Sequence, residues 1–279
     1  LNICQINNVK LFLSIDPLMD NQKNYRLNKD GKSLWNIIEK NIALLKETNL
    51  NKTCVVRTVY NIEENGDLFE YVKKIFDLGF YVVSVAIPWT KKSTQFSLND
   101  NKVMLFKNQL DKFVDDYINC LESNNFRYIG VHPIVGYINQ WIQNDIVFDI
   151  EACGAGNSLF SIATTGDIYP CHGFNGIDEF IVGNIENKKL NKVFKGLNSL
   201  SIDECNHCFY RLNCRSRCFS DSYYFNKNIL KPNTYKCFIE AEIIAASAYI
   251  YKYLVKRPKI LNIYKKIIEK ESDKYVGRN

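Results

Sequence analysis

The sequence has no long uninterrupted run of apolar residues, no internal repeat and no low-complexity linker. Its longest apolar stretch begins at Phe238 and is broken by Glu240 and Glu242, whereas a helix that crosses a bilayer needs roughly 20 consecutive apolar residues. We therefore expect no membrane-spanning helix and no membrane partner. No signal peptide is visible, and because residue 1 is Leu rather than Met we expect a piece or a processed form of a longer protein.

A strong excess of charge of one sign is also missing. The chain of 279 residues has 36 basic and 30 acidic side chains, which gives a net charge of +6, and the lysines are scattered among Asn, Ile and Tyr. This distribution is typical of a solvated surface rather than of a nucleic-acid-binding face, so we expect no nucleic-acid partner. With 46% hydrophobic residues, the chain is long enough for about two domains with a sizeable core.

Residues 10 to about 123 alternate between strand-like and helix-like segments. Short apolar runs rich in β-branched residues predict parallel strands that are buried on both faces. Helical periodicity lies between them, and in one helix Asp67 is the expected N-cap and Gly79 the expected terminator. The expected strands are 10–15, 53–59 and 81–86, and the expected helices are 34–46, 68–78 and 102–122. Such β–α units imply an α/β fold, but only about three are present, which excludes a complete eight-stranded barrel.

The second part of the chain, after about residue 145, follows a different pattern. Strand-like runs become short, as in "IVFDI" and "SLFSIA", while glycines and cysteines become frequent and long helices are absent until about residue 238. We expect a small second domain whose apolar core is too thin without internal cross-links or bound metal.

Cysteine is the residue type that is most unevenly distributed. Of the ten cysteines, seven lie in the last half of the chain and include the dense run "CNHCFYRLNCRSRC". Their spacing is C-x12-G-x4-C, then C-x2-C-x5-C-x3-C, then a cysteine after eighteen further residues. These seven are the predicted metal ligands: Cys153, Cys171, Cys205, Cys208, Cys214, Cys218 and Cys237.

Iron–sulfur clusters, zinc and disulfides are the three interpretations of this pattern. Disulfides require an oxidising compartment, and a zinc ion needs four ligands, usually in two tight pairs separated by a dozen or more residues. Dense cysteine runs are typical of iron–sulfur proteins, in which the last cysteine of a run often serves a second cluster. The spacing favours one cluster on Cys205, Cys208, Cys214 and a distant cysteine, with Cys218 joining Cys153 and Cys171 at another.

The intervening basic residues fit that interpretation. A 4Fe–4S cluster with thiolate ligands carries net negative charge, which nearby guanidinium groups compensate. We expect this role for Arg211, Arg215 and Arg217, unless they are simply exposed surface residues. The remaining cysteines, Cys4, Cys54 and Cys120, are expected to be ordinary small packing residues.

The cysteine pattern resembles the SPASM domain of radical S-adenosylmethionine (SAM) enzymes. Their seven-cysteine signature is C-x9–15-G-x4-C, C-x2-C-x5-C-x3-C and a final C, and every spacing agrees. Upstream, "LFLSIDP", "GKSLWNIIEKNIALLKE" and "VVRTVY…DLFEYVKKIFDLGF" resemble strand and helix segments of the same enzymes. The resemblance implies the C-terminal portion of a partial (β/α)6 radical SAM barrel at 1–145. A SPASM domain at 146–240 and C-terminal helices at 241–279 complete the expected domain organisation.

The segments "CGAG", "GDIYPCHGF" and "DEFIVGNI" look most like enzymes that form thioether or related crosslinks in ribosomally synthesised peptides, above all maturases of six-cysteine precursors. The resemblance implies that Cys205, Cys208, Cys214 and Cys237 ligate auxiliary cluster II. It assigns Cys153, Cys171 and Cys218 to auxiliary cluster I. Sulfatase maturases have a further cysteine shortly after the first, which this chain lacks, so the fourth ligand is open to a substrate cysteine or to His172.

The resemblance further implies an oxidoreductase-type peptide maturase in a reducing cytoplasm. Its cofactors would be SAM, two auxiliary 4Fe–4S clusters and a third, SAM-cleaving cluster. Its partners would be a cysteine-containing precursor peptide and an electron donor such as ferredoxin or flavodoxin. Sulfatase maturases and the maturase of quinohemoprotein amine dehydrogenase are the alternative enzyme types.

Two motifs of the family are missing. The C-x3-C-x2-C motif that holds the SAM-cleaving cluster and the Gly-Gly-Glu segment do not occur in the chain, and Pro17 replaces the usual Gly. We therefore expect the chain to be a fragment, or a peptide-binding remnant without SAM chemistry. Ser14 and Asp16, at the end of an expected strand, and Arg57, which could reach a carboxylate in the same pocket, are candidate SAM-pocket residues. Their structural alternatives are turn capping for Ser14 and Asp16 and an ion pair for Arg57.

Overall fold

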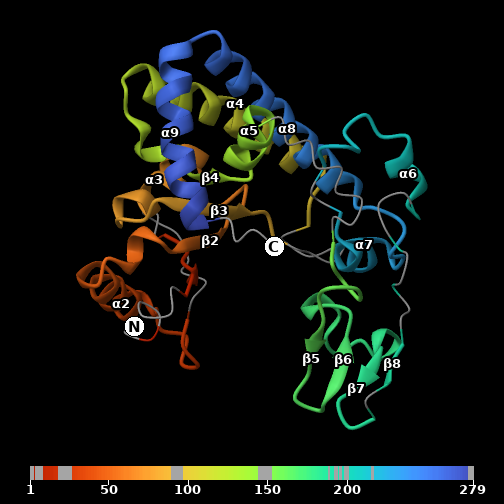
Figure 1. The fold of residues 1–279 in the computed structure, drawn as a ribbon. Coiled ribbons are helices and arrows are strands. Elements are labelled where there is room, and N and C mark those ends of the chain that lie inside the picture. The colour runs from red at the N-terminus through yellow and green to blue at the C-terminus, as the bar shows by residue number, and fades with distance from the viewer. Residues whose placement is uncertain are drawn as a thin grey trace. The chain divides into compact units, whose positions relative to one another are not determined.

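The computed structural model describes residues 3, 9–17, 27–88, 97–143, 153–187, 189–191, 194, 197, 201–214 and 217–275. The chain forms two compact units, coloured along the sequence in Figure 1. The first unit comprises residues 1–88, 101–146 and 242–279, and the second comprises residues 89–100 and 147–241. Of residues 241–279, which we expected to form C-terminal helices, all but Ala241 are part of the first unit.

A parallel sheet forms the centre of the first unit. In the described part of the chain its strand order is β1 (Phe12–Ser14), β2 (Val55–Val59), β3 (Val82–Ala86) and β4 (Val131–His132). The side chains of Val56 and Val83, in its middle, are completely buried. The three predicted strands are confirmed, and β4 is an addition.

Helices connect the strands and continue after the sheet. Between the strands lie α2 (Trp35–Glu47), α3 (Leu68–Asp77) and α4 (Asp100–Glu122), as predicted. The others in this unit are α5 (Ile134–Ile142), α9 (Pro258–Tyr275), most of α8 (Thr234–Val255) and the short 3-10 turns η1 (Leu50–Lys52) and η2 (Phe126–Tyr128). None of the described helices is both long and apolar enough to cross a membrane. The expected α/β fold with a parallel sheet is confirmed.

Helix α3 begins and ends where the sequence predicts. The Asp67 carboxylate accepts a hydrogen bond of 2.9 Å from the backbone N–H of Glu70, which satisfies one of the free donors of the first turn. Gly79 follows the last turn with a φ of +94°, a conformation that glycine adopts without steric cost.

A buried tyrosine pair joins α4 to α9. The hydroxyl groups of Tyr117 and Tyr264 lie 3.1 Å apart, and Tyr117 also donates to the backbone carbonyl of Ile129 at 3.1 Å. Burial raises the pKa of both phenols, so both stay neutral. At the surface, Lys107 of α4 forms an ion pair of 3.0 Å with Glu242 of α8. These contacts hold both C-terminal helices against α4.

The second unit contains short elements. An antiparallel sheet has the order β5 (Ser161–Ile162), β6 (Asp167–Tyr169), β7 (Gly183–Asn184) and β8 (Lys189–Leu190) within the described residues. The 3-10 turns η3 (His172–Phe174) and η4 (Asp178–Phe180), helices α6 (Asp203–Asn206) and α7 (Phe219–Asn226), and the start of α8 complete it.

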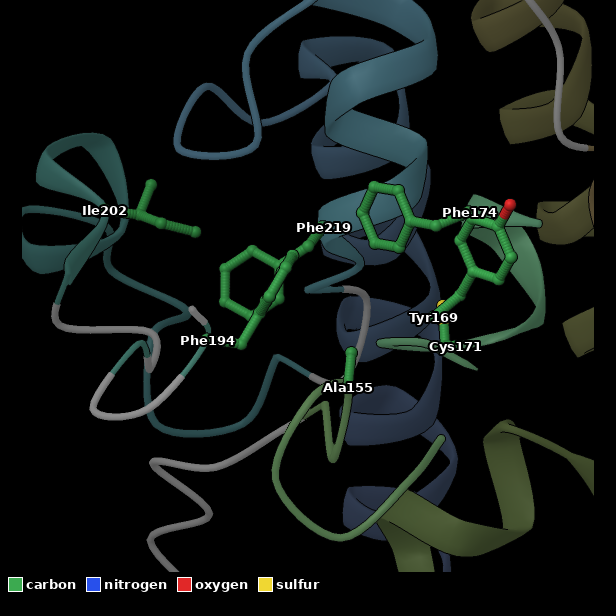
Figure 2. Close-up of a cluster of buried hydrophobic side chains, with 7 residues drawn as sticks. All are labelled: Ala155, Tyr169, Cys171, Phe174, Phe194, Ile202 and Phe219. Atoms are coloured by element: carbon green, nitrogen blue, oxygen red, sulfur yellow. The ribbon is translucent and has the colours of Figure 1, made fainter. Parts of the chain in front are cut away.

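An aromatic cluster forms the core of the second unit. Figure 2 shows the side chains of Phe194 and Phe219 next to each other, with ring centroids 5.7 Å apart. Phe174 packs on Phe180 at a centroid distance of 4.2 Å, and Phe180 in turn meets Tyr223 edge to face. The buried members of the cluster are Ala155, Tyr169, Cys171, Phe174, Phe194, Ile202 and Phe219. Large rings therefore build a small core in a unit with little regular structure.

Candidate metal centre

The loop that begins at Cys153 closes onto the segment that precedes Cys171. The backbone N–H of Gly156 donates to the carbonyl of Leu159 at 3.0 Å and to that of Pro170 at 2.9 Å. Gly156 has a φ of +71°, and a Cβ atom there would lie 2.5 Å from Cβ of Phe194. Both the conformation and the space therefore require glycine at the end of the "CGAG" motif. The loop brings the chain at Cys153 towards the chain at Cys171.

Three cysteines from separate elements come together here. Cys171 follows β6 and is 5% exposed, while Cys218 is half-buried and precedes α7. Burial raises the pKa of both thiols, and electrostatic repulsion from the Cys153 thiol raises it further in each case. Repulsion of this kind acts only between nearby groups. We call Cys153, Cys171 and Cys218 the first thiol group.

The other four predicted cysteines form a second thiol group: Cys205, Cys208, Cys214 and Cys237. Cys205 lies in α6, and tight turns follow, since Cys208 donates its N–H to the Cys205 carbonyl at 3.2 Å. Cys237 comes from the first turn of α8. Although Cys237 is exposed as a residue, burial of its thiol and repulsion from the other three thiols raise the pKa to about 12. The three thiols of the dense run therefore lie near the sulfur of Cys237.

Two of the predicted arginines support the loop that carries the second thiol group. The Arg211 guanidinium donates to the Asn206 carbonyl at 2.9 Å, and that of Arg217 donates to the Arg211 carbonyl. Burial raises the pKa of Cys205, and the positive charge of Arg217 acts in the opposite direction. Arg215 lies outside the described residues.

The remaining candidates are placed as follows. None of the cysteines that the structure describes forms a disulfide; Cys4 lies outside the described residues. Cys54 and Cys120 belong to the first unit; Cys54 is buried and Cys120 is half-buried. His172 follows Cys171 in η3 and is exposed. Within the described ranges, no three His, Cys, Asp or Glu side chains are arranged to hold a single metal ion.

The donor atoms of the two thiol groups can be compared with the needs of an iron–sulfur cluster. Each group offers only sulfur donors, from chain segments far apart in sequence, beside a compact aromatic core. A 4Fe–4S cluster takes one thiolate on each iron, so its ligands are spread around several atoms rather than one. Groups of three and four converging thiols fit that chemistry.

The candidate SAM-pocket residues lie on the sheet of the first unit. Oδ1 of Asp16 accepts hydrogen bonds from the hydroxyl of Thr58 at 3.1 Å and from the N–H of Val59 at 3.0 Å. Asp16 therefore ties the chain after β1 to the end of β2. Ser14 and Arg57 are exposed and are register partners on these two strands.

The strand register adds two residues that sequence patterns did not identify. Ser14 pairs with Arg57, Arg57 pairs with Ser84, and Ser84 pairs with His132, so each strand contributes one member. Paired residues of neighbouring strands project from the same face of a sheet. Ser14, Arg57, Ser84 and His132 form what we call the polar row. Finding Ser84 and His132 from the sequence would have required the register of β3 and β4.

The second unit also has an open polar depression of about 660 Å³. It lies over the β6–β7–β8 sheet and is lined by Asp167, Ile181, Gly183, Asn184, Glu186, Asn187 and Asn191. No predicted site residue lines it.

The chain is similar in sequence to a maturase. It is 25% identical over 227 residues to the cysteine-type anaerobic sulfatase-maturating enzyme of Clostridium novyi (strain NT). The match covers 76% of this chain and 58% of the relative, so the chain spans less than two thirds of the relative's length. No protein-family model matches the chain.

Solved structures of anSMEcpe share the fold. Native anSMEcpe with bound AdoMet aligns at a TM-score of 0.65 and 18% identity, over 95% of this chain and 71% of that one. The histidine-tagged protein with bound AdoMet gives a TM-score of 0.67 at 17% identity, over 98% and 70% of the two chains. Native anSMEcpe with bound AdoMet and Kp18Cys peptide gives 0.62 at 17% identity, over 95% and 71%. The chain is thus similar in sequence to an anaerobic sulfatase-maturating enzyme and shares the α/β fold of the anSMEcpe structures. Its parallel sheet is consistent with a partial barrel.

Proposed function

We propose that the chain is part of a radical SAM enzyme that modifies a cysteine-containing peptide and holds two auxiliary 4Fe–4S clusters. The observation that carries this proposal is the convergence of seven cysteines into groups of three and four thiols in the second unit. Similarity to the Clostridium novyi maturase, and to a structure that contains both AdoMet and a peptide, supports it.

The second thiol group would hold auxiliary cluster II with four thiolates. The first thiol group would hold auxiliary cluster I with three, and its fourth ligand would be a cysteine of the peptide or His172. When bound, a cluster with an open iron supplies a Lewis acid that favours the thiolate form of a ligating cysteine, and an electron acceptor. The thiols of the chain hold and orient that cluster, and the aromatic core beside them excludes water.

In the first unit, the polar row would contact SAM and the peptide. Ligands of parallel-sheet proteins bind at the carboxyl ends of the strands, and two members of the row, Ser14 and His132, are the last residues of their strands. The exposed guanidinium of Arg57 suits a carboxylate, to which arginine can donate two parallel hydrogen bonds. Asp16 serves the same site indirectly, because its hydrogen bonds align β1 with β2.

For the product we propose a thioether or related crosslink in a ribosomally synthesised peptide. The supporting observation is the first thiol group, which has three cysteines and so supplies one ligand fewer than a 4Fe–4S cluster takes, which a cysteine of the peptide would provide. A sulfatase maturase is the second candidate, because the sequence relative is of that type. A peptide-binding remnant without SAM chemistry is the third. We place the enzyme in a reducing cytoplasm with ferredoxin or flavodoxin as electron donor.

Metal analysis tests the clusters directly. Protein purified without oxygen and reconstituted with iron and sulfide should contain roughly eight irons and eight labile sulfides per chain. Stoichiometric zinc without labile sulfide would contradict the proposal, and so would a complete failure to bind iron.

The reaction is tested with the whole enzyme, encoded by the reading frame that includes any C-x3-C-x2-C segment upstream of Leu1. A six-cysteine precursor peptide and a sulfatase peptide are each incubated with enzyme, SAM and reductant. Thioether formation removes two hydrogens from the precursor and makes one thiol resistant to alkylation, which mass spectrometry detects. Modification of the sulfatase peptide alone would favour the second candidate, and an upstream region without the motif would favour the remnant.

A further inference from the structure

Ser220, in the first turn of α7, places a buried hydroxyl against the first thiol group. Its Oγ lies 3.2 Å from Sγ of Cys218, and its hydroxyl is near enough to the Cys171 thiol to act to lower the pKa of that thiol. The residue is 1% exposed, so water does not compete for these contacts. One hydroxyl therefore lies against Cys218 and close to Cys171, two of the three cysteines of the first thiol group, which are 47 residues apart in the chain.

We propose that Ser220 is a positioning residue of auxiliary cluster I, whose hydroxyl proton is donated to a ligating cysteine sulfur and raises the reduction potential of that cluster. This inference rests on the proposed function, since it requires iron at the first thiol group. The sequence pattern does not indicate this role, because Ser220 is not one of the residues that define the cysteine spacing.

The direction of the hydrogen bond follows from counting protons. With free thiols, either Ser220 or a cysteine can be the donor, as both carry one proton. Metal binding removes the proton of each ligating cysteine, which leaves thiolates that only accept. The serine hydroxyl is then the donor in the Ser220–Cys218 and Ser220–Cys171 contacts, and it can donate to one sulfur at a time.

The distance supports a hydrogen bond rather than ligation by Ser220 itself. At 3.2 Å from the sulfur of Cys218, the serine oxygen is within the range of an O–H···S hydrogen bond. Cluster irons prefer thiolate ligands, and the sulfur of Cys218 is already available at this position. Ser220 therefore acts on the cluster through the cysteines.

The effect on the cluster has a definite sign. Reduction adds negative charge to a cluster that is already anionic, and a hydrogen bond to a ligating sulfur stabilises the more negative state. Removing the hydroxyl should make reduction of cluster I harder. Cluster II would have its own four thiols, and among the described residues none of them is hydrogen-bonded to Ser220, so its potential should not change.

A neighbouring serine provides the matched control. Ser222 lies on the same helix and is 4% exposed, and its backbone N–H donates to the Cys218 carbonyl at 3.0 Å. No contact of its hydroxyl with a cysteine sulfur is found in the described part of the chain. Ser222→Ala removes the same atom from the same buried helix.

The experiment is a redox titration, followed by electron paramagnetic resonance, of the full chain reconstituted with iron and sulfide. We expect Ser220→Ala to bind as much iron and sulfide as the unsubstituted protein, with one of the two cluster potentials shifted to more negative values. Ser220→Thr, which keeps the hydroxyl, should restore the potential, and Ser222→Ala should leave both potentials unchanged.

The outcomes separate this inference from the proposed function. Full iron content with both potentials unchanged in Ser220→Ala would overturn the role of Ser220 alone. An equal shift of both potentials, or the same shift in Ser222→Ala, would overturn it too, because the effect would then be structural. Absence of iron from the unsubstituted protein would overturn the proposed function and the inference together.

Discussion

The carboxylate of Asp16 accepts a hydrogen bond from the backbone N–H of Val59 at 3.0 Å, and the same oxygen accepts one from the Thr58 hydroxyl at 3.1 Å. The residues are more than forty positions apart, and the contacts fasten the end of β1 to the end of β2. A residue that the sequence marks as a ligand-pocket candidate thus has a clear structural role in this sheet.

Asp16→Ala should lower the free energy of unfolding by about 2 kcal/mol, since it removes a charged acceptor from two hydrogen bonds. Asp16→Asn keeps an acceptor oxygen in place and should cost less than half as much. Urea denaturation at pH 7 measures both values. An Asp16→Ala protein as stable as the unsubstituted one would show that these hydrogen bonds do not hold β1 in place.

Cys214→Ala should remove cluster II and leave cluster I in place. After reconstitution we expect roughly half of the iron to remain, because each cluster contributes four irons. The second unit should also melt at a lower temperature than in the unsubstituted protein. Cys120→Ala, a half-buried cysteine of the first unit, is the control and should keep all the iron. Full iron content in Cys214→Ala would remove this residue from the ligand set.

Asp67 links the stability of the fold to pH. Partial burial acts to raise the pKa of this carboxyl, but hydrogen bonds from Lys112 and from the Glu70 N–H outweigh it and hold the pKa below its ordinary value. A group whose pKa is lowered by folding stabilises the protein fully above the unfolded pKa of about 3.9. That contribution is lost as the pH falls through the lower pKa of the folded state.

Asp67→Ala should therefore cost about 1 kcal/mol at pH 7, and the difference from the unsubstituted protein should narrow as the pH falls below about 4. Asn is also a good N-cap, so Asp67→Asn should lose only the contribution of the Lys112 contact. Guanidinium denaturation over a pH series measures these differences. A difference that stays constant down to the acid limit of folding would contradict the assigned pKa shift.

Gly130→Ala should destabilise the sheet. A Cβ atom at this position would lie 2.1 Å from the backbone carbonyl oxygen of Tyr81, and backbone atoms cannot move aside without disturbing β3. We expect a loss of about 3 kcal/mol, at the upper end of the range for overpacking. Gly31→Ala is the comparison, because Gly31 has a φ of +75° but open space around it and should lose only about 1 kcal/mol from backbone strain. Equal melting temperatures for the two variants would refute this explanation.

The sequence predicts the first three strands and the helices between them, because each has a strong local signal. Asp67 and Gly79 set the limits of α3, and the apolar runs of β2 and β3 are long enough to recognise. The strand β4 is missed since it is two residues long and lies between Gly130 and Pro133. Its existence depends on the close approach of Gly130 to Tyr81, which is a tertiary contact that no local pattern encodes.

For the candidate site, the spacing of the cysteines predicts the division into the first and second thiol groups. The iron–sulfur clusters that these groups would hold stay a prediction. Ser220 could not be found in this way. Its contact with Cys171 depends on how β6 and α7 pack around the aromatic core, while its position two residues after Cys218 is not distinctive.

The polar row depends on the register of the parallel strands. Its four members are adjacent only through strand alignment, and their chain neighbours Leu13, Val56, Val83 and Val131 are apolar. A shift of one strand by a single residue towards these neighbours would exchange a polar member for an apolar one. Insertions in the connecting loops leave the alignment intact, whereas a one-residue deletion inside β2 would turn Arg57 away from its partners. Changes of loop length therefore preserve this face, whereas substitutions or length changes inside the strands alter it.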